Sequence, residues 1–409
     1  MSQQLSRDIH PAAFIPRALK TLFSLALSAA ILLGSGVSGI SQELVATVEP
    51  VKDNDIIPIR LTGFSGEAYS VLDFDLSVVG FQIVTNGGAF ELEATSDGGF
   101  GGVLSDLRGG KSRVFAKRYN GSDVRGLAHA LADDVVQSVR KVPGIGRSKI
   151  LFRCESPAGS KKFEIYLADF DGHNARPITR DNTVVRDPAW NPKTGMAYYV
   201  TYLKGNPDIV AHNLRTGQRT VVANFGGTNS GPTISPDGNR LAMILSRDGN
   251  QELYTSSPSG GGFNRLTQTR EMEVAPCWSP DGSRLCFTGG SKPLLYTIDA
   301  NGGTPRRLTL GGATHATEPS WSPDGKWIAF TQTNGTRFSV YVVPGGGGNC
   351  INLTGGEDPN WSPNSRTLIF SRRVSGDRRV LSVLDVPTKQ VKDLPLSSLG
   401  NCTQPTWGN

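Results

Sequence analysis

The sequence lacks the short motifs that identify common catalytic and nucleotide-binding domains. No Gly-x-Ser-x-Gly segment is present, so no serine peptidase accompanies the rest of the chain. A phosphate-binding loop and a dinucleotide fingerprint are also missing. Only five histidines occur, and they are scattered without the spacing of metal ligands: His10, His129, His173, His212 and His315. We therefore expect no catalytic residues, no cofactor and no resident metal.

Charge is sparse and spread out. Charged residues make up 19% of the chain and the net charge is +6, with no long basic block. The densest basic clusters are Arg372-Arg373 and Arg378-Arg379, which we interpret as a solvated loop. Nucleic-acid binding would need a basic face with interleaved aromatic residues, so we expect no nucleic-acid partner.

Long apolar runs are missing except near the start. Arg17 and Lys20 precede an apolar run, Leu22 to Leu33, and small residues follow it. This order is typical of a secretory signal peptide, predicted over residues 1–41 with cleavage within about 36–42. We therefore expect export to the periplasm and no membrane insertion after cleavage. The five cysteines would then meet an oxidising compartment, and an odd number leaves at least one outside intramolecular pairs.

Glycine (49) and proline (25) are abundant, which favours many tight turns. A twelve-residue stretch, Pro319 to Phe330, contains Trp-Ser-Pro-Asp-Gly and recurs along the chain. Its anchor positions, 40 to 46 residues apart, are Trp190, Ile234, Trp278, Trp321, Trp361 and Trp407. Each unit reads as four short antiparallel strands, with a type I turn and a left-handed glycine at Pro-Asp-Gly. Four strands at this period are typical of β-propeller blades.

Five complete units and one partial unit at each end predict six blades over residues 143–409. Ser148 to Thr179 supplies three strands, and Gln404 to Trp407 supplies the missing inner one. We predict that the C-terminal strand closes the ring by pairing with Ile150 to Arg153, which removes two exposed sheet edges. The fold class is thus mainly β.

A small α/β domain is predicted before the propeller, over residues 42–142. Two amphipathic helices are expected, at 66–79 and at 122–139, the second capped by Ser122 and ended by Pro143-Gly144. Strands are expected at 55–62, 81–84, 89–93 and 111–117. The glycine-rich stretch 98–110 is expected to carry a turn or a short strand.

The predicted strand register indicates which cysteines lie opposite each other. With Ser322 opposite Lys326, residue 332 faces residue 316, and the same mapping on the split blade places Cys154 opposite Cys402. A disulfide between these two would fasten the ring. Directly paired strands often have poor geometry for such a bond, so free thiols are the alternative. The same register puts Cys277 and Cys286 out of phase.

Features repeated in every blade are framework by default, so we looked for residues that differ between blades at one equivalent place. Such residues precede each Pro-x-Trp, where the chain reaches the channel mouth. Several are acidic, namely Asp187, Glu273, Glu318, Glu357 and Asp358, and His315 lies beside them. An acidic, irregular rim could bind a basic segment of a partner, or it could be a solvated loop.

These residues also carry a resemblance to the TolB family. The repeats have the Trp-Ser-Pro-Asp-Gly form, and a tyrosine recurs in the third strand at Tyr166, Tyr254, Tyr296 and Tyr341. The segment Arg125 to Asp133 is similar to the helix that ends the family's N-terminal domain. Asp75-Leu and Gly80-Phe81 resemble a family turn. Ile234 in place of tryptophan, and Asn364-Ser365 in place of Asp-Gly, depart from the pattern.

The resemblance implies a non-enzymatic, monomeric scaffold of the Tol–Pal system, which supports outer-membrane integrity and envelope constriction at division. It implies that the propeller mouth binds peptidoglycan-associated lipoprotein, at positions that match Thr228, Asn229, Gly231, Val274 and Ala275. It also implies that an N-terminal segment, here 42–51, engages the inner-membrane-anchored partner TolA.

Two alternatives remain open. The first is a secreted six-bladed hydrolase or lyase with a metal in the central channel, held by Asp187, Glu318 and Asp358. The second is a propeller that binds a small ligand or a glycan.

Overall fold

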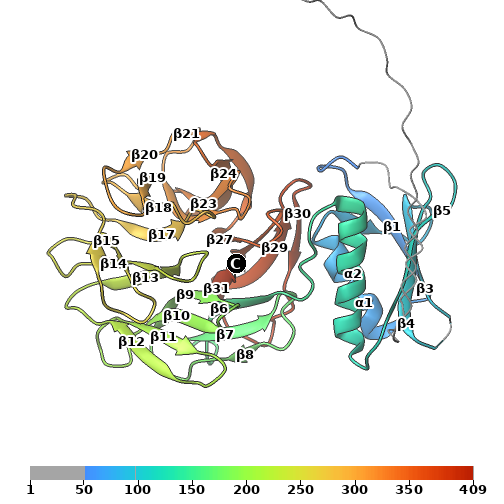
Figure 1. Cartoon of the computed structure of the whole chain (residues 1–409), viewed down its shortest axis with the longest axis horizontal. Helices are drawn as coiled ribbons and strands as arrows, with labels where there is room; N and C mark the ends of the chain where they lie inside the picture. The colour runs from blue at the N-terminus through green and yellow to red at the C-terminus, as the bar shows by residue number, and fades with distance from the viewer. Residues whose placement is uncertain (1–50, 97, 409) are drawn as a thin grey trace, which may run out of the picture. The chain divides into compact units, whose positions relative to one another are not determined.

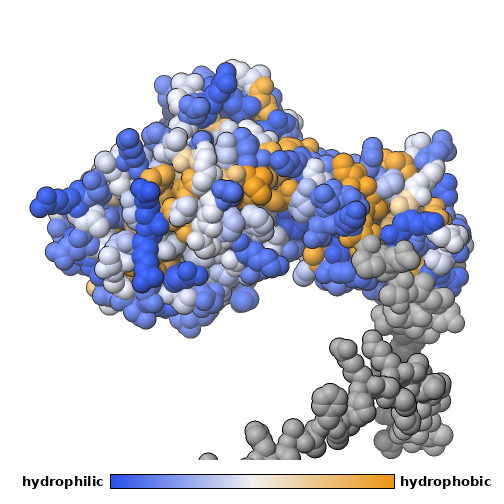
Figure 2. Space-filling view, turned by 90° about the horizontal axis from the view of Figure 1, so that it is seen from above, coloured by the Kyte–Doolittle hydropathy of each residue, from blue (hydrophilic) through white to orange (hydrophobic). Residues whose placement is uncertain are grey.

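A computed structural model describes residues 51–96 and 98–408. The predicted signal peptide, and all but the last residue of the segment 42–51, lie outside these residues. Within the described part of the chain, no helix is both long and apolar enough to cross a membrane. The face drawn in Figure 2 is mainly hydrophilic, with smaller hydrophobic patches.

The N-terminal domain is a five-stranded mixed sheet with two helices. The strand order is β2-β1-β3-β4-β5, and β1 runs parallel to both of its neighbours while the other pairs are antiparallel. The strands are β1 (Ile57–Thr62), β2 (Phe81–Ile83), β3 (Phe90–Ala94), β4 (Phe100–Asp106) and β5 (Ser112–Tyr119). The glycine-rich stretch thus forms a seven-residue strand, longer than we expected. A Cβ on Gly102 would lie 3.0 Å from Leu131, so the glycine allows close packing against a helix.

The two helices lie where the apolar pattern predicts them, with shifted ends. They are α1 (Gly66–Ser77) and α2 (Val124–Arg140). The predicted cap Ser122 is wrong, because the side chain of Asp123 accepts the backbone N–H of Gly126. At the other end, Lys141 adopts a left-handed conformation and ends α2 before Pro143 is reached.

Six four-stranded sheets form the propeller, as predicted (Figure 1). In the order in which they pair within each blade, the strands are as follows: β31 (Cys402–Trp407), β6 (Lys149–Glu155), β7 (Phe163–Asp169), β8 (Arg176–Pro177); β9 (Val185–Asn191), β10 (Met196–Thr201), β11 (Asp208–Asn213), β12 (Arg219–Ala223); β13 (Asn229–Ile234), β14 (Leu241–Leu245), β15 (Glu252–Ser256), β16 (Asn264–Arg265); β17 (Val274–Trp278), β18 (Arg284–Gly289), β19 (Leu294–Asp299), β20 (Arg306–Arg307); β22 (Ala316–Trp321), β23 (Trp327–Asn334), β24 (Arg337–Pro344), β26 (Ile351–Gly355); β27 (Glu357–Trp361), β28 (Thr367–Ser375), β29 (Arg378–Asp385), β30 (Gln390–Asp393). Two short strands outside the six blade sheets, β21 (Leu310–Gly311) and β25 (Gly348–Asn349), pair in parallel with each other.

The C-terminal strand closes the ring. β31 pairs with β6, and Cys402 is the register partner of Cys154. The two cysteines form a disulfide, with Cα atoms 4.1 Å apart. The indole of Trp407 is buried and donates to the Ser148 hydroxyl at 2.9 Å. Closure therefore rests on strand pairing, a buried tryptophan and a covalent bond.

Every blade contains a one-residue bulge in its first strand. In the blade of β22, Ala316 pairs with Gln332 as predicted, but Ser320 pairs with Ala329 because the register shifts between them. The same shift occurs between β17 and β18, where it brings Cys277 directly opposite Cys286. Our prediction that these two cysteines are out of phase is therefore wrong. It assumed one continuous register, which holds only on the far side of the bulge.

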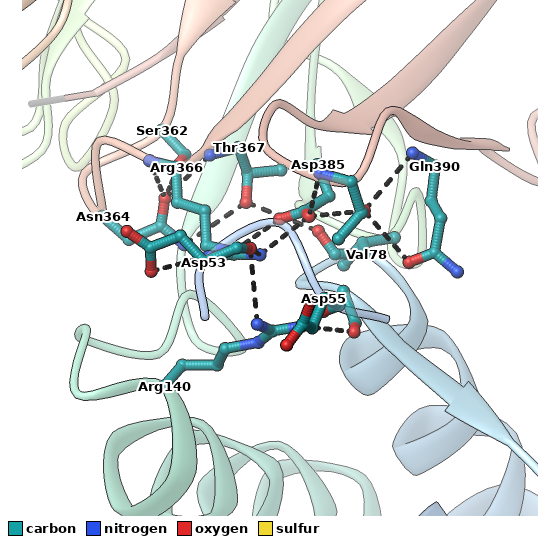
Figure 3. A network of polar contacts seen from close by, with 12 residues as sticks. Asp53, Asp55, Val78, Arg140, Ser362, Asn364, Arg366, Thr367, Asp385 and Gln390 are labelled. Atoms are coloured by element: carbon teal, nitrogen blue, oxygen red, sulfur yellow. Dashed lines mark hydrogen bonds and ion pairs between the residues drawn. The ribbon is translucent and has the colours of Figure 1, made fainter. Parts of the chain in front are cut away.

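The N-terminal domain and the propeller share contacts through residues 52–55. Arg140, the last residue of α2, donates to the carbonyls of Lys52 and Asp55 at 3.2 and 2.6 Å. Arg366 in the propeller donates to the carbonyl of Asp53 at 3.0 Å and forms a buried ion pair with Asp385 at 2.6 Å. Figure 3 shows both guanidinium groups directed at this segment. The segment is thus held from both domains.

Candidate functional site: the propeller mouth

Six equivalent residues line the channel where the first strands begin. Each directly precedes a proline, and each has a left-handed backbone with φ between 50° and 57°: Asp187, Gly231, Ala275, Glu318, Asp358 and Gln404. All of them except Gly231 line a channel cavity of about 180 Å³. Five of the six are not glycine, and a left-handed conformation is costly for such residues. The surrounding structure must therefore hold these residues in place.

Side chains of the neighbouring blades supply that support. Glu318 Oε2 accepts the backbone N–H of Asp358 at 3.1 Å, and Asp358 Oδ2 accepts that of Gln404 at 3.0 Å. Gln404 Oε1 then accepts the N–H of Asp187, and Asp187 Oδ2 accepts that of Gly231 at 3.2 Å. We call this series the inner relay. It corrects our expectation of a solvent-facing acidic rim, because these carboxylates join one blade to the next.

Burial disfavours the ionised form of two relay carboxyl groups, Glu318 and Asp358. Burial, reinforced by the charge of Asp358, raises the pKa of Glu318, and burial also raises the pKa of Asp358. The Thr331 hydroxyl donates to Glu318 at 2.6 Å. These carboxyl groups are therefore suited to accept internal hydrogen bonds more than to present negative charge to a partner.

Three other predicted mouth residues make internal contacts, and two of them are buried. Glu273 accepts a hydrogen bond from the Thr269 hydroxyl at 2.6 Å, and burial raises its pKa. Asn229 is fully buried, donates to the carbonyl of Phe225 and accepts the N–H of the same residue. Glu357 is half-buried and paired with Arg379 at 2.8 Å. We had expected all three to be available to a partner, and the structure gives each an internal contact.

The relay has no side-chain acceptor at Gly231 and Ala275, since neither side chain carries an oxygen. We call the mouth next to these two residues the open sector. Val274 is 37% exposed there, and Met272, which the sequence reasoning did not single out, is 60% exposed. Thr228 is half-buried and His315 is exposed. Exposed apolar side chains beside a concave opening are typical of a protein-binding surface. Their exposure could not be read from a sequence pattern.

A second polar cluster joins the two domains. His129 Nδ1 of α2 lies 2.6 Å from Asp75 Oδ2 of α1, and its Nε2 lies 3.8 Å from Asp171 of the propeller. Burial raises the pKa of Asp75 to about 7. Burial alone would lower the pKa of His129, but the nearby carboxylates outweigh it and raise that pKa.

One potential ligand atom from each of Asp75, His129 and Asp171 lies within 4.8 Å of the others, close enough to share a metal ion. Arg125 is paired with Asp171, however, and Asp75 is bonded to the imidazole. An arginine within the group would oppose a cation. The arrangement is therefore explained as a charge contact between the domains.

Comparisons with known proteins agree with this architecture. A family model described as "TolB beta propeller domain" matches residues 136–409. The chain is 33% identical to "Protein TolB homolog" of Chlorobium chlorochromatii over 52% of this chain and 49% of that protein. It is 30% identical to "Tol-Pal system protein TolB" of Bordetella parapertussis over 70% of this chain and 65% of that protein. The matched region thus spans about half to two thirds of these relatives.

The crystal structure of TolB from Acinetobacter baumannii has the same fold. It superimposes with a TM-score of 0.76 over 90% of this chain and 99% of the other, at 23% sequence identity. The matched family model covers the whole six-bladed ring, including the strand that closes it. The chain therefore belongs to the TolB β-propeller family.

Proposed function

We propose that this protein is a non-enzymatic scaffold of a Tol–Pal envelope system in the periplasm, exported by the leader at residues 1–41. Membership of the TolB family supports this assignment, and a related protein of the family carries the name of that system. The propeller mouth would bind peptidoglycan-associated lipoprotein, and the segment 42–51 would engage the inner-membrane partner TolA. Such bridging would support outer-membrane integrity and envelope constriction at division.

The open sector is the observation that carries the proposal. In the open sector, Gly231 and Ala275 contribute no side-chain oxygen to the inner relay. The exposed side chains of Met272 and Val274 lie beside these two residues. Apolar side chains at the centre of a contact supply much of its binding energy. The metal-dependent hydrolase alternative requires the carboxylates of Asp187, Glu318 and Asp358, and one oxygen of each already accepts an N–H group of a neighbouring blade. This geometry favours a docking surface.

Titration calorimetry tests the proposal. The soluble domain of the same organism's lipoprotein would be titrated into the wild-type protein and into a Met272→Asp/Val274→Asp variant. We expect the variant to bind about tenfold more weakly or worse, because burying a new charge in an apolar contact is costly. A Val221→Asp variant is the matched control, because Val221 is 43% exposed on the outer strand β12, away from the mouth. Equal affinity of wild type and mouth variant would contradict the proposal.

A further inference from the structure

Two hairpins of adjacent blades project past the mouth. In the blade of β22, first-strand pairing ends at Ala316 and Gln332, yet β23 and β24 continue to pair as far as Asn334 and Arg337. In the next blade, β28 and β29 continue past Ser371 to the Arg373–Arg379 pair and beyond. By contrast, β14 and β15 stop where first-strand pairing stops. The mouth is thus raised on one side only.

A groove of about 560 Å³ lies between these hairpins. Its charged lining consists of Arg337, Arg372, Arg373 and Arg379 against a single carboxylate, Glu357. Apart from Phe338, the remaining lining is small or hydroxylated and includes Ser339, Thr354, Gly355 and Gly356. We call it the hairpin groove. A volume of several hundred Å³ can hold a few residues of a polypeptide.

The four arginines differ in how strongly they are paired with carboxylates of the protein itself. Arg372 forms two hydrogen bonds to Asp393, at 2.9 and 2.7 Å, and Arg379 is paired with Glu357. Arg373 lies 3.8 Å from Asp377, a residue whose side chain is 97% exposed. Arg337 forms no ion pair within residues 51–96 and 98–408. Two guanidinium groups therefore face solvent at the groove with little or no neutralisation.

We propose that the hairpin groove binds the carboxylate side chains of an acidic protein segment. The planar guanidinium fork matches a carboxylate in two parallel hydrogen bonds. Phe338 and Val374 are exposed at the rims and offer apolar contact to the backbone and methylenes of a polypeptide, which a small inorganic anion lacks. The inference rests on the proposed function, because the groove adjoins the mouth where a protein partner would dock.

Fluorescence anisotropy with a labelled probe tests this proposal. The probe is a twelve-residue peptide of alternating glycine and glutamate, and the comparison probe has glutamine in place of glutamate. We expect the glutamate probe to bind at low salt, to dissociate at high salt, and to bind an Arg337→Glu/Arg373→Glu variant about tenfold more weakly or worse. Arg306→Glu/Arg307→Glu is the matched control, with the same charge change on exposed residues of β20. It should retain binding within about threefold of wild type.

Several outcomes would overturn the proposal. The glutamine probe could bind as tightly as the glutamate probe, or the control variant could lose as much affinity as the groove variant. Millimolar phosphate could displace the glutamate probe as well as high salt does. The protein could also bind phosphatidylglycerol vesicles in a way that excludes the probe. The two proposals fail separately. Loss of lipoprotein binding in Met272→Asp/Val274→Asp concerns the mouth, whereas that variant should still bind the glutamate probe. Circular dichroism confirms that each variant is folded.

Discussion

The disulfide between Cys154 and Cys402 should account for a large part of the resistance of the ring to opening. It joins positions separated by 248 residues, so it restricts the unfolded chain strongly. The chain-entropy relation gives about 5.5 kcal/mol for a loop of this length, and measured values for native disulfides are commonly about 2 to 5 kcal/mol. We expect a loss of about 3 kcal/mol on reduction.

Urea denaturation followed by tryptophan fluorescence measures this loss. Oxidised and reduced wild-type protein have the same side chains, so their comparison isolates the covalent bond. With a denaturant slope of about 3 kcal/mol/M, the midpoint should fall by about 1 M. A Cys350→Ala variant controls for the reductant, since Cys350 is one of the free cysteines. Its oxidised and reduced forms should differ as those of wild type do.

Hydrogen exchange locates the effect. Reduction should free β31 first, because this strand belongs to the split blade and the disulfide joins it to β6. Amides of 402–407 should lose protection before those of β14, which lies in a continuous blade. If the reduced protein keeps the same urea midpoint, and β31 keeps its protection, strand pairing and Trp407 alone close the ring. That result would refute the reasoning.

Two further predictions concern the contacts between the domains. Because burial raises the pKa of Asp75 to about 7, the folded protein keeps a proton that the unfolded chain releases above about pH 4, and stability should fall as pH rises through this window. In Asp75→Asn, thermal midpoints at pH 5 and pH 8 should differ less than in wild type, and an unchanged difference would argue against Asp75 as the source. Replacing Arg366 by Met leaves Asp385 buried without its partner and should lower the free energy of unfolding by about 3 to 5 kcal/mol. A loss as small as that of the exposed control Arg306→Met in urea denaturation would contradict this.

The blade count and the closure of the ring were predictable because both follow from residues that repeat. The Trp-Ser-Pro-Asp-Gly stretch marks the same strand and turn in successive blades, and Trp407 without following strands indicates a split blade. Patterns of apolar residues likewise placed both helices of the N-terminal domain. Such patterns can be recognised in the sequence because each involves residues that lie close together in the chain.

The bulge could not be predicted, because its position is occupied by Asp, Gly, Ala, Glu, Asp and Gln in turn. The residue type at the position itself varies, and the proline that follows it in every blade ordinarily disfavours a helical conformation before it. The predicted register was therefore right beyond the bulge, at Cys154 and Cys402, and wrong between the turn and the bulge, at Cys277 and Cys286. Contacts such as Arg366 with Asp53 join residues far apart in the chain and leave no local pattern.

The six residues that precede the prolines at the mouth differ for a structural reason. Candidate functional surfaces are therefore better sought in the residues around them. Glu318, Asp358, Gln404 and Asp187 each support the next blade, so their variety reflects local fit. The open sector and the hairpin groove are neighbours around the ring, the first apolar and the second cationic. A partner that uses both must place its apolar surface over one and its carboxylates over the other, which allows a single orientation. High salt should then slow association more than it speeds dissociation, because long-range charge steers the approach while the apolar contact retains the bound partner.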